Sequence, residues 1–135
     1  MWGVWIPVVA YAGLIFGLSS IPDLPTPTST DHLDKVAHFF EYGILGVLLI
    51  RASNRTLRRA TLWVHVPLMV VIGAVLAALD ETYQGTVGRE QSLADWGADV
   101  AGLVAVAVIY VGGRSRGRFG GAVESANLKK RGSNP

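Results

Sequence analysis

The chain has 135 residues, of which 50% are apolar and only 16% are charged, and its mean hydropathy is +0.38. A soluble domain usually carries about 25% charged residues, so this composition argues against a soluble globular protein. The chain contains no cysteine, which excludes a disulfide framework, a thiol nucleophile and thiolate metal ligands.

Four apolar segments follow one another along the chain. They cover residues 2–18, 36–50, 62–79 and 96–111. A membrane-spanning helix needs about 20 residues, and each segment reaches that length when its flanking turns are added. Four such helices leave only short loops and a tail. The sequence therefore predicts an all-α fold, a polytopic membrane protein whose domain over residues 1–112 is a bundle of four transmembrane helices.

Basic residues are concentrated on one side of the predicted membrane. Ten of the twelve follow the second or the fourth segment, namely Arg51, Arg55, Arg58, Arg59, Arg114, Arg116, Arg118, Lys129, Lys130 and Arg131. Because basic loops stay in the cytoplasm, both termini are predicted to be cytoplasmic. The residues 113–135 have no apolar period and are predicted to be a disordered, basic cytoplasmic tail. Topology accounts for the positive charge, so we expect no nucleic-acid partner.

Small residues recur at a spacing of four in two of the predicted helices. Gly13 and Gly17 form such a step in the first helix, and Ala98 and Gly102 form one in the fourth. These steps allow the backbones of membrane helices to approach closely. We therefore interpret both as packing positions. Three prolines, Pro22, Pro25 and Pro27, are expected to end the first helix.

Polar residues gather at the predicted outer ends of the second, third and fourth helices. In the second helix, Asp34, His38 and Tyr42 recur every four residues and so share one stripe. The candidate pocket residues are Asp34, Lys35, His38, Tyr42, Asp80, Glu81, Gln84, Arg89, Ser92, Asp95 and Asp99. Short loops make the three helices neighbours, so these side chains are predicted to converge in a polar pocket that faces outward. The alternative is that they only hold the helices together through interhelical hydrogen bonds.

The order of these polar residues resembles the VanZ-like family of small bacterial membrane proteins, over about residues 1–112. The segments that carry the resemblance read Asp34-Lys35-Val36-Ala37-His38-Phe39-Phe40-Glu41-Tyr42 and Asp80-Glu81-Thr82-Tyr83-Gln84, continuing to Arg89, Ser92, Asp95 and Gly102. The resemblance implies a multi-pass plasma-membrane protein of the cell envelope. The family's founder is linked to resistance to the glycopeptide teicoplanin, but the resemblance implies no particular reaction. The family often has Asn where this chain has Asp99, so no role that needs an amide is implied there.

Several functions are compatible with this pattern. The first hypothesis is an envelope protein that binds or modulates a lipid or a lipid-linked phosphorylated precursor, with Lys35, His38 and Arg89 holding the phosphate. An alternative is a membrane-embedded hydrolase or transferase that uses His38 with the carboxylates, with or without a divalent metal. A third is proton-coupled transport through Glu41 and Asp99. Membrane lipids are the expected partners, and an oligomer or another membrane protein is compatible. From the sequence we assign no catalytic residue, cofactor or metal ligand.

Overall fold

The computed structural model describes residues 2–21, 31–57, 61–89 and 91–131, and every regular element within these residues is a helix. A short turn of 3-10 helix, η1 (Trp2–Val4), leads into α1 (Ile6–Ser19), and the longer helices are α2 (Asp31–Thr56), α3 (Leu62–Thr86) and α4 (Leu93–Arg131). The all-α class is therefore confirmed. The three prolines expected to end the first helix, together with Arg58 and Arg59, lie outside the described residues.

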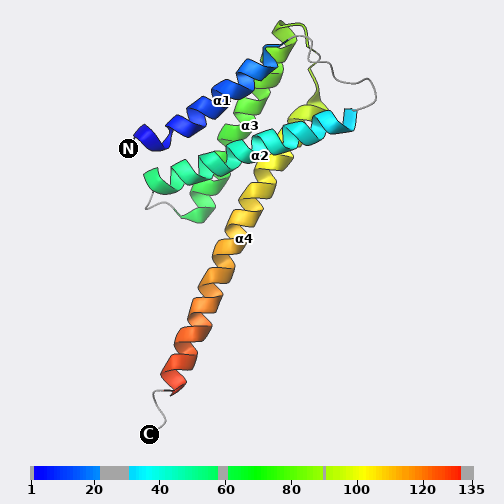
Figure 1. Cartoon of the computed structure of the whole chain (residues 1–135). Helices are drawn as coiled ribbons and strands as arrows, with labels where there is room; N and C mark the ends of the chain where they lie inside the picture. Colours follow the sequence, from blue (N-terminus) through cyan, green and yellow to red (C-terminus); the bar gives the residue numbers. More distant parts are fainter. Residues whose placement is uncertain (1, 22–30, 58–60, 90, 132–135) are drawn as a thin grey trace.

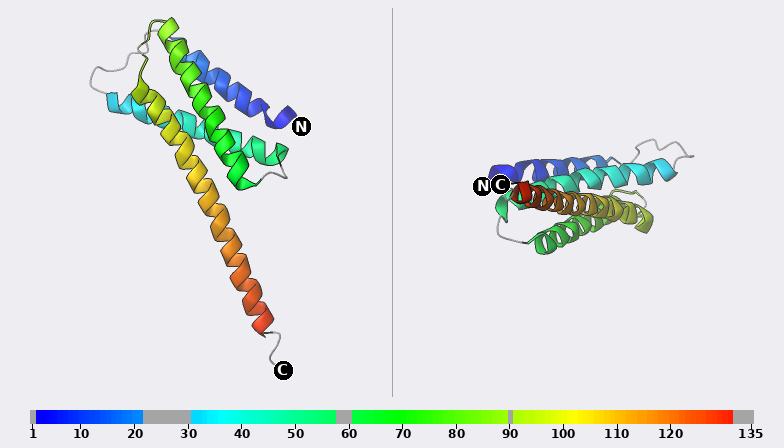
Figure 2. Two further views of the ribbon diagram at one scale, coloured as in Figure 1. Left: turned by 180° about the vertical axis from the view of Figure 1, so that it is seen from behind. Right: turned by 90° about the horizontal axis from the view of Figure 1, so that it is seen from below.

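The N-terminal half of α4 is the centre of the bundle. It contacts α2 most extensively and α3 next, and α1 packs on α2 and α3. Seen from below, α4 lies between α1 and α2 on one side and α3 on the other (Figure 2). The indole nitrogen of Trp5 donates a 3.0 Å hydrogen bond to the hydroxyl of Thr56. This bond places the start of the chain beside the C-terminal end of α2 (Figure 1).

Three of the helices are long and apolar enough to cross a membrane, over Leu33–Thr56, Leu62–Thr86 and Leu93–Ser115. The helix α1 has 14 residues, which corresponds to roughly 21 Å at 1.5 Å per residue. This length is shorter than the hydrocarbon core of a bilayer, which is about 30 Å thick. The structure thus supports three of the four predicted spans by length.

The molecule is apolar outside and partly polar inside. Trp63 is 80% exposed and Ile109 is 74% exposed, whereas His38, Asp80 and Asp99 are buried. In water, such an apolar surface would be unfavourable because burial of apolar side chains drives folding. In lipid, the same surface has no such cost. The arrangement is that of a membrane protein, as the composition predicts.

Glycine allows α2 and α4 to approach closely. A Cβ atom added to Gly102 would collide with the backbone carbonyl oxygen of Phe39 on α2. The packing role expected for Gly102 is therefore confirmed. A Cβ atom added to Gly13 or Gly17 would meet nothing within 4 Å. The packing prediction for that pair is wrong within the chain, because α1 buries the opposite face, which carries Ile15.

The helix α4 extends much further than its apolar segment. It continues to Arg131, and its C-terminal part projects beyond the other helices (Figure 1). The sequence predicts a disordered tail over residues 113–135, whereas the structure has a helix over 113–131. No proline occurs between Leu93 and Arg131 to end the helix. The absence of an apolar period does not exclude a helix.

Candidate functional site

A buried pair of side chains joins α2 and α4 near the N-terminal ends of both helices. His38 Nδ1 and Asp99 Oδ1 lie 3.0 Å apart. His38 is 7% exposed and Asp99 is fully buried. Gly102 lies one turn after Asp99, and its missing side chain lets the two helices come close enough for this pair to form. The pair is therefore a product of the local helix packing.

A second charged pair lies about one turn further toward the ends of the same two helices. The ammonium group of Lys35 and Asp95 Oδ1 are 3.6 Å apart. The Lys35 side chain is 31% exposed, and that of Asp95 is 13% exposed. The exposed fraction thus falls from this pair to the His38 pair, so the cluster reaches inward from the end of the bundle.

Glu81 brings α3 into the same cluster. Its Oε2 atom accepts a 2.9 Å hydrogen bond from the backbone N–H of Ser92, while its buried Oε1 atom has no hydrogen-bond partner among the described residues. Ser92 immediately precedes α4, and its hydroxyl accepts a 3.3 Å hydrogen bond from the backbone N–H of Asp95. Ser92 is therefore an N-cap that holds the start of α4 against α3.

Asp80 belongs to a separate set of contacts. Its Oδ2 atom accepts 3.0 Å hydrogen bonds from the hydroxyl of Ser19 and from the side-chain amide of Gln84. Successive residues of a helix point about 100° apart, so Asp80 faces α1 while Glu81 faces α4. The sequence predicts both carboxylates in one pocket, without Ser19. The period of a single helix does not show which neighbour each of its faces meets.

The remaining candidates lie at the margins of the cluster. Tyr42 is buried one turn beyond His38, and its hydroxyl has no partner among the described residues. Arg89 lies half-buried between α3 and α4, and its backbone N–H donates a 3.0 Å hydrogen bond to the carbonyl oxygen of Gln84. Asp34, half-buried on α2, has a carboxylate oxygen near His38 and Asp95.

Two sets of three side chains have the spacing of metal ligands. One consists of Asp34, His38 and Asp95, and the other of His38, Glu81 and Asp99. Within each set, one nitrogen or oxygen atom of every residue lies within 4.8 Å of one from each of the others. Imidazole and carboxylate groups are common ligands of divalent cations.

Among the described residues, two cavities on the surface of the helices can be compared, and one of these two touches the polar cluster. A cavity of about 400 Å³ is lined by Ala78, Glu81, Thr82, Gln91, Ser92, Leu93 and Trp96. Glu81 and Ser92 connect this cavity to the cluster. Gln91, Thr82 and Trp96 were not predicted from the sequence, because nothing in their spacing marks them as neighbours of Glu81.

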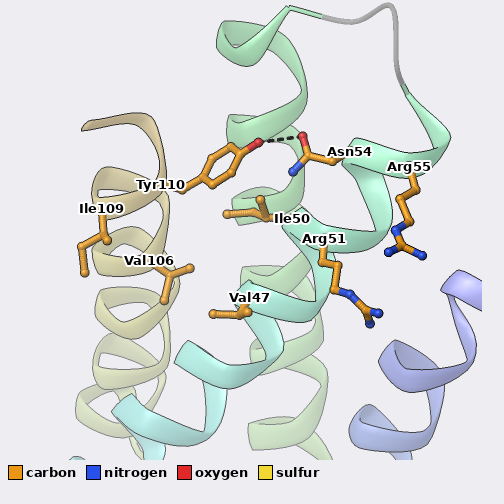
Figure 3. Close-up of a pocket in the computed structure, with 8 residues that line it drawn as sticks. All are labelled: Val47, Ile50, Arg51, Asn54, Arg55, Val106, Ile109 and Tyr110. Carbon is orange, nitrogen blue, oxygen red and sulfur yellow. Dashed lines mark hydrogen bonds between the residues drawn. The ribbon is translucent and has the colours of Figure 1, made fainter. Parts of the chain in front are cut away.

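The second cavity, of about 540 Å³, lies near the C-terminal end of α2 and contains none of the predicted pocket residues. It is lined by Val47, Ile50, Arg51, Asn54, Arg55, Val106, Ile109 and Tyr110 (Figure 3). The Tyr110 hydroxyl donates a 2.8 Å hydrogen bond to Asn54 Oδ1 across it. Apart from the two arginines, this cavity is mostly apolar.

Comparison with known proteins gives one match. The family model for VanZ/LLP1 matches residues 4–114, which include α1, α2, α3 and the part of α4 up to residue 114. No curated protein and no solved structure matches the chain. The match covers the polar cluster and its supporting helices, in agreement with the resemblance seen in the sequence. The chain therefore belongs to the VanZ/LLP1 family and is a membrane protein.

Proposed function

We propose that this protein is a multi-pass plasma-membrane protein of the cell envelope that binds a lipid-linked phosphate at its polar cluster. The ligand is a phosphorylated lipid or a lipid-linked phosphorylated envelope precursor. The observation that carries the proposal is the position of the cluster, which borders the cavity that contains Glu81 and Ser92. That cavity combines the hydroxyl groups of Ser92 and Thr82 with the apolar surfaces of Leu93 and Trp96. A polar headgroup and an apolar chain can both be accommodated there.

Energetic cost supports a functional role for the cluster. An ionised side chain in the middle of a membrane helix costs roughly 2.5–3.5 kcal/mol on insertion scales. An interhelical hydrogen bond in a membrane protein contributes about 0.6 kcal/mol on average. Asp99 and Glu81 are buried acidic residues inside predicted spans. Asp99 and Glu81 lie nearer the ends of their spans, where the cost is smaller, and a bound ligand would offset what remains of it.

The distribution of charge supports an outward-facing site and cytoplasmic termini. Arg51 and Arg55 lie at the C-terminal end of α2, and Arg114 lies beyond Tyr110 on α4, at the opposite end of these helices from His38 and Asp99. Basic ends of membrane helices remain in the cytoplasm. In this orientation the cluster is near the outer face, where a precursor of the envelope is available.

Binding of a polyprenyl monophosphate to the purified chain in lipid nanodiscs tests the proposal. We expect Lys35→Ala and Arg89→Ala each to weaken binding at least about tenfold, since a charge-assisted hydrogen bond contributes about 1.5–3 kcal/mol. The matched control is Arg51→Ala, which removes a cation at the far cavity and is expected to bind like the unaltered chain. The uncharged polyprenol is the control ligand. Equal binding by all three variants would exclude a phosphate site at the cluster.

A second candidate function is a membrane-embedded hydrolase or transferase. The observation that favours it is the 3.0 Å contact between His38 and Asp99, since a carboxylate that orients an imidazole is a common arrangement for a general base. Release of inorganic phosphate, or transfer of the phosphoryl group, should then occur in the unaltered chain and be lost in His38→Ala. Binding without turnover would favour the first function.

A further inference from the structure

The innermost part of the polar cluster combines one imidazole with two carboxylates. Three side chains from three different helices meet there: His38 of α2, Glu81 of α3 and Asp99 of α4. All three are buried. We infer that these residues form a binding site for a divalent transition-metal cation, for which Zn²⁺ is the best match. The inference concerns the cation alone and does not depend on the lipid ligand proposed above.

Unpartnered oxygen atoms are the first observation that points to a ligand. Glu81 uses Oε2 to accept a hydrogen bond from Ser92, and Asp99 uses Oδ1 in the contact with His38. The other oxygen of each carboxylate is buried and has no hydrogen-bond partner among the described residues. Glu81 is 8% exposed and Asp99 is fully buried. A buried acceptor without a partner costs about 1–3 kcal/mol, and coordination of a cation removes this cost.

Spacing is the second observation. The ligand atoms of the three residues lie within 4.8 Å of one another. In a tetrahedral zinc site, bonds of about 2.1 Å place the ligand atoms roughly 3.4 Å apart. The ligand atoms would therefore have to approach one another by at most about 1.4 Å to surround an ion.

The balance of charge also favours a cation. Four carboxylate residues are buried in the described part of the chain, namely Asp80, Glu81, Asp95 and Asp99. Lys35 is paired with Asp95, and His38 is the buried base beside Asp99. Asp80 receives hydrogen bonds from neutral groups only. A divalent cation at Glu81 and Asp99 would offset their negative charge where it is least solvated.

The outer set of Asp34, His38 and Asp95 is a weaker candidate. The ammonium group of Lys35 lies 3.6 Å from Asp95 Oδ1 and would repel a metal ion bound there. The inner set also borders the cavity lined by Glu81 and Ser92, which gives an ion an entry path and leaves room for water. Zinc sites with three protein ligands commonly hold water in the fourth position. Mg²⁺ and Ca²⁺ favour sites built from oxygen atoms alone, so a histidine ligand argues against them.

Metal content and metal-dependent stability of the untagged 135-residue chain in detergent test this site without any lipid phosphate. We expect about one Zn²⁺ per chain by mass spectrometry after incubation with Zn²⁺ and removal of excess. Zn²⁺ should also raise the unfolding temperature of the chelator-treated protein. Glu81→Gln, Asp99→Asn and His38→Ala should each reduce the bound zinc at least about tenfold.

Glu81→Gln and one further variant, Asp80→Asn, make the outcome decisive. Glu81→Gln keeps an oxygen that can accept the hydrogen bond from Ser92, so it should fold even if His38→Ala does not. Asp80→Asn removes a buried carboxylate outside the set and should retain the full zinc content. Absence of zinc from the unaltered chain, with no change in unfolding temperature, would overturn the inference. Equal zinc binding by Glu81→Gln and the unaltered chain would also overturn it. Failure of polyprenyl phosphate binding alone would affect only the proposed function.

Discussion

The two ends of the helix pair α2 and α4 deal with charge in opposite ways. At the N-terminal end, His38 and Asp99 bury their ionisable side chains between the helices. At the other end, Arg51 and Arg55 are exposed, and the cavity beside them is lined mainly by apolar side chains (Figure 3). The same two helices thus form a polar interior at one end and an apolar groove at the other. Burial of charge is therefore a local property of one end, and that end is where a ligand is expected.

The largest loss of stability is expected when the buried pair of His38 and Asp99 is broken. His38→Ala leaves Asp99 fully buried beside a vacant space, and removal of one partner of a buried pair typically costs about 3–5 kcal/mol. Unfolding of the metal-free protein by SDS titration in mixed micelles measures the change in the free energy of unfolding. A loss below about 0.5 kcal/mol would show that the pair behaves like an exposed one.

A smaller loss of stability is expected when the close helix contact beside this pair is disrupted. Gly102→Ala places a methyl group against the carbonyl oxygen of Phe39, which belongs to the backbone and cannot rotate away. Overpacking of this kind costs about 1–3 kcal/mol. The matched control is Gly97→Ala, where an added Cβ meets nothing within 4 Å and the free energy of unfolding should stay equal or rise. If the two variants unfold alike in the same titration, the proposed close approach of α2 and α4 is wrong.

A substitution at the C-terminal end of α2 should lower the stability less. Asn54→Ala removes the hydrogen bond from Tyr110, which is partly buried. A neutral hydrogen bond contributes about 0.5–1.5 kcal/mol, and the Tyr110 hydroxyl that remains can reach the open cavity. The variant should unfold about 1 kcal/mol more easily and should bind zinc like the unaltered chain. Reduced zinc binding would mean that the two ends are coupled.

The smallest effect on stability is expected at the rim of the cluster. Lys35 and Asp95 form a pair at 3.6 Å whose lysine is about one-third exposed. Such pairs contribute about 0–1 kcal/mol and weaken as salt is added. Lys35→Ala should therefore change the free energy of unfolding by less than about 1 kcal/mol while still weakening binding of the lipid phosphate. A loss as large as that of His38→Ala would place Lys35 in the buried interior.

Much of the helical structure follows from patterns that the sequence displays directly. The spacing of Asp34, His38 and Tyr42 places them on one helical stripe, and apolar composition marks the three long spans. Close approach at Gly102 also follows, since a small residue in a membrane helix is typical of packing. These features depend on one helix at a time, and local periodicity is sufficient to predict them.

Features that depend on how helices are placed against each other could not be predicted in this way. Ser19 reaches Asp80 only because α1 packs on α3, and Gln91 lies near Glu81 only because the chain folds back before α4. Gly13 shows the reverse case, since its spacing indicates packing but its face of α1 is open. The period of a helix defines its faces, whereas the partner of each face is decided by the tertiary arrangement.

A double-mutant cycle of His38→Ala and Asp99→Ala, read out as the free energy of unfolding of the metal-free protein, tests most directly whether α2 and α4 meet in a shared polar site. Residues in contact show coupling energies of about 0.5–3 kcal/mol, while independent residues add within about 0.3–0.5 kcal/mol. The 3.0 Å separation of these buried groups predicts a coupling of at least about 1 kcal/mol. Strict additivity of the two single losses would contradict the account.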